Sequence, residues 1–275
     1  MKKFENIVIA SDLDGTYFAD DAMLVPRNLE RVKYFCENGG HFTFATGRVP
    51  VFTKMSIADP GSLIDLPAVT GNGSCLYDFK NEKPIWEHFV DMDAFADLAD
   101  TVRRLAPHAA FRGATLNGFV IPGLENKYNL KEYTEYPDFM EKLVMPMEKW
   151  GELDLYKVNV ISDAQTLEML YPILREGFSD RFNVTRSGYL AIEIMAHGTS
   201  KAVMLRKMVD ERFGKNVTLY TVGDQDNDLE MHSIADVAVC PANANDAVKA
   251  VCKYCLCDNN SGVIGDLIDL LDRQV

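Results

Sequence analysis

The sequence is poor in basic residues and in cysteine, and it contains no long apolar run. Its 28 Lys and Arg residues face 41 Asp and Glu residues, so the formal net charge is −13 at pH 7. Nucleic acids and anionic membranes are polyanions, and this charge argues against both as partners. Six cysteines are too few and too irregular for a disulfide framework in 275 residues, which favours a reducing, cytoplasmic location.

Apolar segments are too short for a membrane span or a signal peptide. The run at 7–10 is interrupted at once by Ser11 and Asp12, whereas a signal peptide needs an apolar core of about 7–15 residues. A bilayer-spanning helix needs roughly 18 or more. With 47% hydrophobic and 25% charged residues, the composition predicts a soluble globular protein of one large or two smaller domains. Nothing in it indicates an oligomeric state.

Both ends of the chain alternate short apolar runs with segments of helical spacing. The expected buried strands are 6–11, 41–46, 67–70, 217–222 and 236–240. The expected helices are 27–38, a further helix before 67, then 200–213, 227–235 and 262–273. Ser200 is a suitable N-cap residue for one of these helices. The alternation predicts an α/β fold with a Rossmann-like, doubly wound parallel sheet.

The middle of the chain has a different pattern. Runs 111–122 and 182–195 alternate polar and apolar residues, as antiparallel hairpins do, and helical spacing occurs at 93–106 and 164–177. We therefore expect residues 83–195 to form an α+β domain that is inserted into the α/β core. The core is then discontinuous and consists of 1–82 and 196–275.

The first chemical signal is Asp12-Leu13-Asp14-Gly15-Thr16, directly after the first expected strand. Residues two apart in an extended backbone point the same way, so Asp12 and Asp14 are expected to face one pocket. That pocket would lie at the carboxyl end of a parallel strand, where open α/β sheets bind ligands. Two neighbouring carboxylates repel each other unless a cation or a shared proton relieves them. The pattern favours catalysis or metal binding over an ordinary strand-end turn, where Asp and Gly are also common.

Three further signals follow expected strands or begin an expected helix. Thr46-Gly47-Arg48 ends the second strand, where a hydroxyl group and an accessible backbone N–H suit a phosphate oxygen. Lys201 stands near the N-terminus of a helix, between the other motifs. Residues 223–228 read Gly-Asp-Gln-Asp-Asn-Asp and follow another strand. They lack the later Gly and Glu of an EF-hand loop, and a magnesium site with one or two carboxylates fits them better.

Taken in order, DLDGT, TGR, a lysine before a helix and GDxxND resemble the motifs of the haloacid dehalogenase superfamily of phosphatases. The resemblance covers the whole chain. The interval between Asp14 and Thr46 is too short for a lid domain, so the inserted domain falls between Thr46 and Lys201. This location resembles the Cof-type branch, which has the larger type of second cap. One departure is His197-Gly198, where the family often has a proline before the glycine.

The resemblance implies a role for each matching residue. Asp12 would be the nucleophile that forms an aspartyl-phosphate, and Asp14 would be the general acid and base. Lys201 would neutralise charge on the nucleophile and on the transferring group. The residues expected to hold phosphate oxygens are Thr46, Gly47, Lys201 and Asn227. The expected ligands of Mg²⁺, the implied cofactor, are Asp12, the backbone carbonyl of Asp14, Asp224 and, as a ligand or as support for the others, Asp228.

Contacts with the rest of the substrate are less constrained by the sequence. Asn72 ends the third expected core strand, where the family's substrate pocket begins, and a plain turn is an equal alternative. Arg48 is a candidate for contact with the leaving group or for an ion pair with a surface acid. Arg112, Asn117 and Tyr189 lie in the expected cap and are candidates for lining the pocket.

Three functions fit these motifs. The favoured one is a magnesium-dependent phosphoric monoester hydrolase for a small phosphorylated metabolite, either a sugar phosphate or a phosphorylated cofactor. A sugar phosphomutase or phosphotransferase would share the core and the aspartyl-phosphate. A non-catalytic phospho-accepting signalling domain ranks last, because such domains are compact and because Asp14 supplies an acid and base for turnover. Substrate choice is expected to reside in the cap, which closes over the site.

Overall fold

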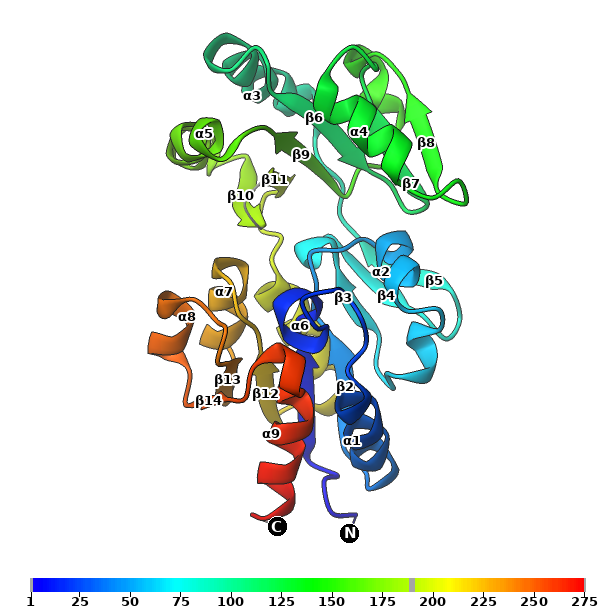
Figure 1. Ribbon diagram of the computed structural model, residues 1–275, viewed down its shortest axis with the longest axis vertical. Coiled ribbons are helices and arrows are strands. Elements are labelled where there is room, and N and C mark those ends of the chain that lie inside the picture. Colours follow the sequence, from blue (N-terminus) through cyan, green and yellow to red (C-terminus); the bar gives the residue numbers. More distant parts are fainter. Residues whose placement is uncertain (1, 188–190, 275) are drawn as a thin grey trace. The chain divides into compact units, whose positions relative to one another are not determined.

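The chain forms two compact units, whose elements are drawn in Figure 1. The computed structural model describes residues 2–187 and 191–274. The first unit, which we call the core unit, consists of Met1–Arg48, Thr53–Trp86 and Ser200–Val275. The second, which we call the inserted unit, consists of Val49–Phe52 and Glu87–Thr199. Tyr189, a candidate pocket residue, lies outside the described residues.

The core unit is built on a five-stranded sheet in which every neighbouring pair is parallel. In spatial order its strands are β14 (Tyr254–Leu256), β13 (Val237–Pro241), β12 (Thr218–Val222), β1 (Ile7–Ser11) and β2 (His41–Phe44). Chain order reverses between β1 and β12. The predicted Rossmann-like, doubly wound fold is therefore confirmed, and this reversal is where such sheets bind ligands.

Helices of the core unit pack as the apolar spacing predicts. The helices are α1 (Pro26–Glu37), α2 (Pro50–Ser56, shared with the inserted unit), α6 (Lys201–Phe213), α7 (Leu229–Ser233), α8 (Asp246–Val251) and α9 (Val263–Asp272). On α6, Met204, Leu205 and Met208 join Val8 and Ala10 of β1 in one buried cluster. Helix α1 lies beside α9 (Figure 1), and Arg27 of α1 donates to Asp269 of α9 at 2.8 Å. Burial of these apolar faces is what stabilises the helices.

The third expected strand belongs mainly to a separate sheet. β3 (Ala68–Thr70), β4 (Cys75–Asp78) and β5 (Lys83–Glu87) form a three-stranded sheet, and an isolated bridge between Ala45 and Val69 links β3 to the core sheet. The expectation that 67–70 is a full strand of the parallel sheet is therefore wrong. Because β5 pairs with β4, residues 83–86 belong to the core unit, although we expected them in the inserted domain.

In the part that the structure describes, the inserted unit has a six-stranded sheet and three α-helices. In spatial order the strands are β10 (Phe182–Ser187), β11 (Ala191–Ala196), β9 (Lys157–Ile161), β6 (Ala110–Ala114), β7 (Gly118–Ile121) and β8 (Glu141–Val144). The helices are α3 (Met92–Leu105), α4 (Lys127–Glu135) and α5 (Ala164–Phe178). The predicted hairpins are present as β6–β7 and β10–β11, and the predicted helices as α3 and α5. The pattern missed α4, β8 and β9.

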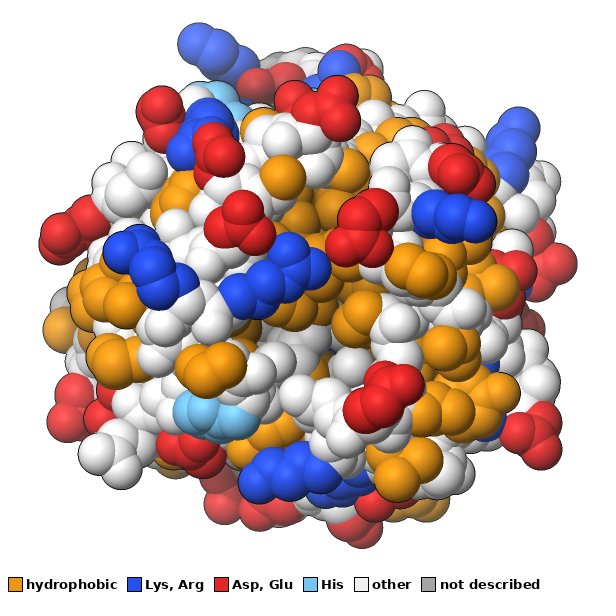
Figure 2. Space-filling model, turned by 90° about the horizontal axis from the view of Figure 1, so that it is seen from above, with side chains coloured by type: hydrophobic (Ala, Val, Ile, Leu, Met, Phe, Trp, Pro, Cys, Tyr) orange, Lys and Arg blue, Asp and Glu red, His pale blue; other side chains and the backbone are white. Residues whose placement is uncertain are grey.

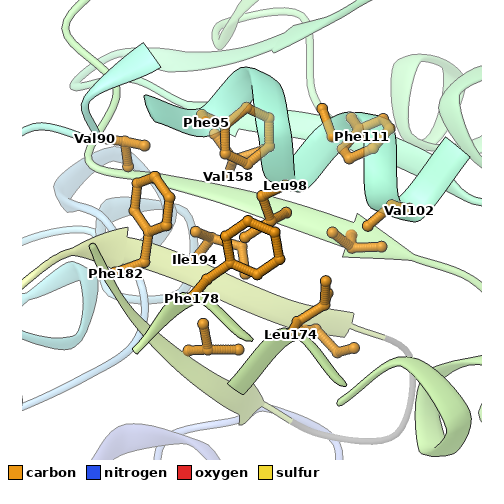
Figure 3. Close-up of a cluster of buried hydrophobic side chains, with 14 of the residues drawn as sticks. Val90, Phe95, Leu98, Val102, Phe111, Val158, Leu174, Phe178, Phe182 and Ile194 are labelled. Carbon is orange, nitrogen blue, oxygen red and sulfur yellow. The ribbon is translucent and has the colours of Figure 1, made fainter. Parts of the chain in front are cut away.

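One face of this sheet is covered by α3 and α5, which form the hydrophobic core of the inserted unit (Figure 3). Phe95 and Leu98 of α3 and Leu174 of α5 pack there against Val158 of β9 and Ile194 of β11. Each side chain of this size contributes about 1.5–3 kcal/mol when it is fully buried. The alternation of strand residues sends their neighbours to the opposite face, where polar and apolar side chains are mixed.

The surface carries charges of both signs. On the face shown in Figure 2, the described acidic and basic side chains are interspersed, with hydrophobic ones between them. Among the described residues, no helix combines the length and the apolar character of a membrane span.

Candidate active site

Two strands on either side of the chain reversal bring the first and fourth motifs together. Ser11, the last residue of β1, pairs with Val222, the last residue of β12. The Asp12 N–H donates to the Val222 carbonyl at 2.8 Å, and Asp224 follows two residues after that strand. Both carboxylates thus start from the same edge of the parallel sheet, which explains why motifs so distant in sequence meet.

Three buried aspartates form an acidic cluster at this edge. Asp12, Asp224 and Asp228 each offer a carboxylate oxygen, and these atoms lie within 4.8 Å of one another. Lys201, the first residue of α6, places its Nζ 2.8 Å from Asp12 Oδ1 and 2.8 Å from Asp228 Oδ1. The predicted N-cap is confirmed, because the Ser200 side chain accepts from the Val203 N–H at 3.3 Å.

Asp228 holds the loop that carries Asp224. Its Oδ2 accepts from the backbone N–H of Asp224 at 2.9 Å and of Gln225 at 3.1 Å, while its Oδ1 accepts from Lys201. Gly223 permits this approach, since a Cβ there would lie 2.4 Å from Asp228 Cγ. Both oxygens of Asp228 are therefore engaged in positioning neighbouring groups.

Residues of the first motif position the side chain of Asp224. Thr16 Oγ1 donates to Asp224 Oδ1 at 2.8 Å, and Gln225 Nε2 lies 3.1 Å from Oδ2. Gly15 adopts a φ of +71°, and a Cβ at this position would come within 2.4 Å of Asp224 Oδ2. The glycine of the first motif is thus required by a left-handed backbone and by a close approach. Burial raises the pKa of Asp224 to about 6.

The charges of the cluster are unbalanced. Burial raises the pKa of Asp12 well above its ordinary value, and Lys201 opposes part of that rise. For Lys201, burial alone would lower the pKa, but Asp12 and Asp228 raise it and the net shift is upward. Three carboxylates against one ammonium leave a formal charge of 1 − 3 = −2 when all are ionised. Buried oxygen ligands with this surplus of negative charge fit a hard divalent cation such as Mg²⁺.

Asp14 lies apart from the acidic cluster. Its side chain is 55% exposed and forms a bidentate ion pair with Arg48, whose Nε lies 2.8 Å from Oδ2 and whose Nη2 lies 2.5 Å from Oδ1. Of the two roles considered for Arg48, the structure thus shows a pair with an acid, and that acid belongs to the first motif. The guanidinium fixes the orientation of the carboxylate through two parallel hydrogen bonds.

The candidate phosphate residues of the second and fourth motifs meet around Asn72. The Asn72 N–H donates to the Thr46 carbonyl at 3.0 Å, and Asn227 Nδ2 donates to Asn72 Oδ1 at 3.3 Å. A Cβ on Gly47 would lie 3.1 Å from Asn72 Nδ2. Asn72 has a φ of +55°, a conformation that is uncommon outside glycine and is enriched at functional positions. The structure therefore brings Thr46, Gly47, Asn72 and Asn227 together.

Sequence reasoning missed several residues that support this arrangement. Thr16 was part of the first motif, but its bond to Asp224 was not anticipated. Asn243 Nδ2 donates to the Gly15 carbonyl at 2.8 Å, and the Asn245 N–H donates to the Asp224 carbonyl at 3.0 Å. Both asparagines follow β13, so a search of every strand's carboxyl end would have found them.

The sequence matches a known family along nearly all of its length. A family model described as haloacid dehalogenase-like hydrolase matches residues 9–268. A 5-amino-6-(5-phospho-D-ribitylamino)uracil phosphatase of Bacillus subtilis is 23% identical, and the alignment covers 96% of this chain and 97% of that one. An HMP-PP phosphatase of Serratia proteamaculans is 25% identical, with 88% of this chain and 86% of that one covered.

Solved structures share the fold. A HAD/COF-like hydrolase of Plasmodium vivax has a TM-score of 0.82 at 19% identity and covers 100% of this chain and 97% of its own. A protein of Thermotoga maritima has a TM-score of 0.75 at 23% identity, with 97% of each chain covered. At these identities the likeness establishes the architecture, and the chemistry must come from the site.

Proposed function

Because the chain belongs to the haloacid dehalogenase-like hydrolases of the Cof type and is a phosphoric monoester hydrolase, we propose that it acts on a small phosphorylated metabolite through an aspartyl-phosphate on Asp12, with Mg²⁺ as cofactor. The observation that carries this proposal is the environment of Asp12. Its Oδ1 accepts from Lys201 at 2.8 Å, whereas its Oδ2 accepts no hydrogen bond from any described residue. One oxygen is thus anchored, and the other is available as a nucleophile.

In the proposed reaction, Asp12 Oδ2 attacks phosphorus and the bond from phosphorus to the leaving oxygen breaks. Asp14 gives a proton to that oxygen, so the substrate leaves as an alcohol. Asp14 then takes a proton from a water molecule, whose oxygen attacks the phosphorus and releases inorganic phosphate and free Asp12. The bidentate pair with Arg48 supports this role, since it fixes the orientation of the Asp14 carboxylate.

Charge neutralisation is assigned to residues that are already buried beside Asp12. Lys201 offsets negative charge as the carboxylate approaches the phosphate, which would otherwise be repelled. Thr46, Gly47 and Asn227 are proposed to hold the phosphate oxygens, since they meet around Asn72. The position of Asn72 also makes it a candidate for contact with the substrate.

The acidic cluster is proposed to hold the metal. Mg²⁺ would be bound by Asp12, the backbone carbonyl of Asp14 and Asp224, and when bound it would neutralise charge on the phosphate. Because both oxygens of Asp228 are engaged by Lys201 and the loop backbone, we assign Asp228 a supporting role. The named relatives act on phosphorylated metabolites, which supports a sugar phosphate or a phosphorylated cofactor as substrate here.

Phosphate release from a panel of sugar phosphates, phosphorylated cofactors and an aryl phosphate tests the proposal. Each substrate is assayed with Mg²⁺, with a chelator, and with the Asp12→Asn variant. We expect release to require Mg²⁺ and to fall by about 10³-fold or more in the variant, because the amide cannot form the acyl phosphate. Hydrolysis by Asp12→Asn at the wild-type rate would show that the nucleophile is another residue.

A further inference from the structure

Three cysteine side chains gather at one end of the core sheet. Cys240 lies on β13, is fully buried, and pairs in register with Cys255 on the neighbouring strand β14. Cys252 follows α8 directly and packs against the small buried cluster that contains Cys240. The Lys253 N–H donates to the Ala238 carbonyl at 2.9 Å, which holds Cys252 beside β13. The fold therefore places three free thiols around one strand.

These thiols differ in acidity and in exposure. Cys252 is half-buried, and its interaction with the Cys240 thiol lowers the pKa of Cys252. The same interaction raises the pKa of Cys240, which therefore keeps its proton. Burial raises the pKa of Cys255, whose thiol donates to the Pro241 carbonyl at 3.9 Å. Because the thiolate is the form that reacts with oxidants, Cys252 is the most reactive of the three, and Cys240 is the thiol beside it.

Helix α8, which lies against β13 (Figure 1), connects these cysteines to the acidic cluster. At its C-terminal end, the Cys252 N–H donates to the Val248 carbonyl at 3.2 Å. At its N-terminal end, the Asn245 N–H donates to the Asp224 carbonyl at 3.0 Å, and Asn245 Nδ2 donates to Asp226 Oδ1 at 2.8 Å. The helix has only six residues, which span about 9 Å. A displacement at one end therefore reaches the other.

We propose that Cys252 and Cys240 form a reversible disulfide when the enzyme is oxidised, and that this bond weakens Mg²⁺ binding at Asp224. This inference rests on the proposed function, since it concerns regulation of the same metal site. Two bonded sulfurs lie closer together than two that only interact, so the bond draws Cys252 toward β13 and moves α8. Asn245 then shifts, and the loop of Asp224 loses a support. Loss of such contacts around a metal ligand lowers metal affinity by about 10- to 100-fold.

Hydrogen peroxide supplies the oxidising equivalents in the proposed reaction. The Cys252 thiolate attacks one peroxide oxygen, the O–O bond breaks, and a sulfenic acid and hydroxide form. The Cys240 sulfur then attacks the sulfenic sulfur, the S–O bond breaks, and the hydroxyl group leaves with the Cys240 proton as water. Two thiols lose two electrons in total, and one peroxide is reduced to two waters. Dithiothreitol reverses the bond by thiol–disulfide exchange.

Peptide mapping without a reductant locates the disulfide. Trypsin cleaves after lysine and arginine, so Cys240 falls on peptide 216–249 and Cys252 on peptide 250–253, while the other two cysteines of this region fall on 254–273. After treatment of the full chain with hydrogen peroxide, we expect a cross-link between 216–249 and 250–253. The cross-link should be absent from Cys252→Ser and should disappear with dithiothreitol.

Calorimetric titration with Mg²⁺ measures the consequence for the metal site. We expect the Kd for Mg²⁺ to rise by about 10-fold in the oxidised wild-type protein and to recover with dithiothreitol. Cys252→Ser should keep the wild-type Kd after peroxide treatment. Cys257→Ser is the matched control, because burial raises the pKa of this nearby thiol to about 11. The control should form the cross-link and respond to peroxide as the wild type does.

Three outcomes would overturn the proposal. They are a cross-link that involves peptide 254–273, a sulfinic acid on Cys252 in place of any cross-link, and a Cys240–Cys252 disulfide that leaves the Kd for Mg²⁺ unchanged. Failure of the phosphatase mechanism is distinct, because it appears in the reduced enzyme as phosphate release that survives Asp12→Asn. Peptide mapping and calorimetry use no substrate, so they are independent of that result.

Discussion

In the core unit, three buried carboxylates cluster beside one lysine, which forms ion pairs with two of them, whereas in the inserted unit the buried Glu193 forms an ion pair with Lys157. The first arrangement has a surplus of negative charge, and the second is neutral. Both bury polar groups at a cost, since desolvation of ions is expensive. The two units therefore differ in charge balance: the surplus in the core unit suits a divalent cation with a phosphate, whereas the pair in the inserted unit needs no further counter-charge.

Removing the shared lysine is expected to have the largest effect. Lys201→Met leaves Asp12 and Asp228 without their cation, so we predict a loss of kcat of about 100-fold or more and a lower Tm. Steady-state kinetics and thermal unfolding check both. The control is Lys207→Met, because Lys207 is an exposed lysine on the same helix that pairs with Glu211; this variant should leave both kcat and Tm unchanged. If Lys201→Met keeps the wild-type kcat, the lysine has no role in the mechanism.

Metal binding should stabilise the core unit through the acidic cluster. A ligand that binds only the native state at 100 times its Kd stabilises it by ~2.7 kcal/mol, so Mg²⁺ is expected to raise Tm. Asp224→Asn should abolish most of that increase, because it removes one buried ligand. The same rise in Tm in both proteins, measured by calorimetry against a chelator blank, would place the Mg²⁺ elsewhere.

Breaking the buried Lys157–Glu193 ion pair tests whether charge balance stabilises the inserted unit. Lys157→Met leaves Glu193 buried without its ion partner, and loss of one partner of such a pair costs about 3–5 kcal/mol. The double variant Lys157→Met/Glu193→Leu removes both charges and should recover much of this loss in chemical denaturation. If the single and double variants are equally unstable, the pair is not the source of the effect.

The smallest predicted effect concerns a helix cap. Asp163, the N-cap of α5, accepts from the Thr166 N–H at 3.0 Å, and this bond lowers the pKa of Asp163 to about 2. A depressed carboxyl pKa contributes stability that is present above its unfolded pKa of about 4. The Tm difference between wild type and Asp163→Ala should therefore shrink as pH falls from about 4 toward 2. A difference that is constant over this range would contradict the cap assignment.

The sequence was most informative where candidate site residues come directly after a strand. Asp12, Thr46 and Asp224 each follow an apolar run, and the parallel sheet brings the ends of these runs to one edge. Local pattern was enough to predict that edge. It was not enough for β14 or α8, which are short and carry little apolar periodicity.

The neighbouring polar residues of the inserted sheet could not have been predicted from the sequence. Arg112, Asn159 and Glu193 lie on three separate strands, and only the pairing register places them side by side. A shift of one residue in any strand would send its side chain to the opposite face. The Arg48–Asp14 pair also depends on tertiary geometry, since either side chain could have pointed to solvent.

Trapping the phosphoryl-enzyme tests the central claim most directly. The wild-type enzyme is mixed with its best substrate and Mg²⁺, quenched in acid within one turnover and digested for mass spectrometry. The account predicts one added phosphoryl group on the peptide that contains Asp12, and none in Asp12→Asn. A phosphoryl group on another residue, or turnover without a phosphorylated Asp12 peptide in a quench series that resolves the first turnover, would contradict it.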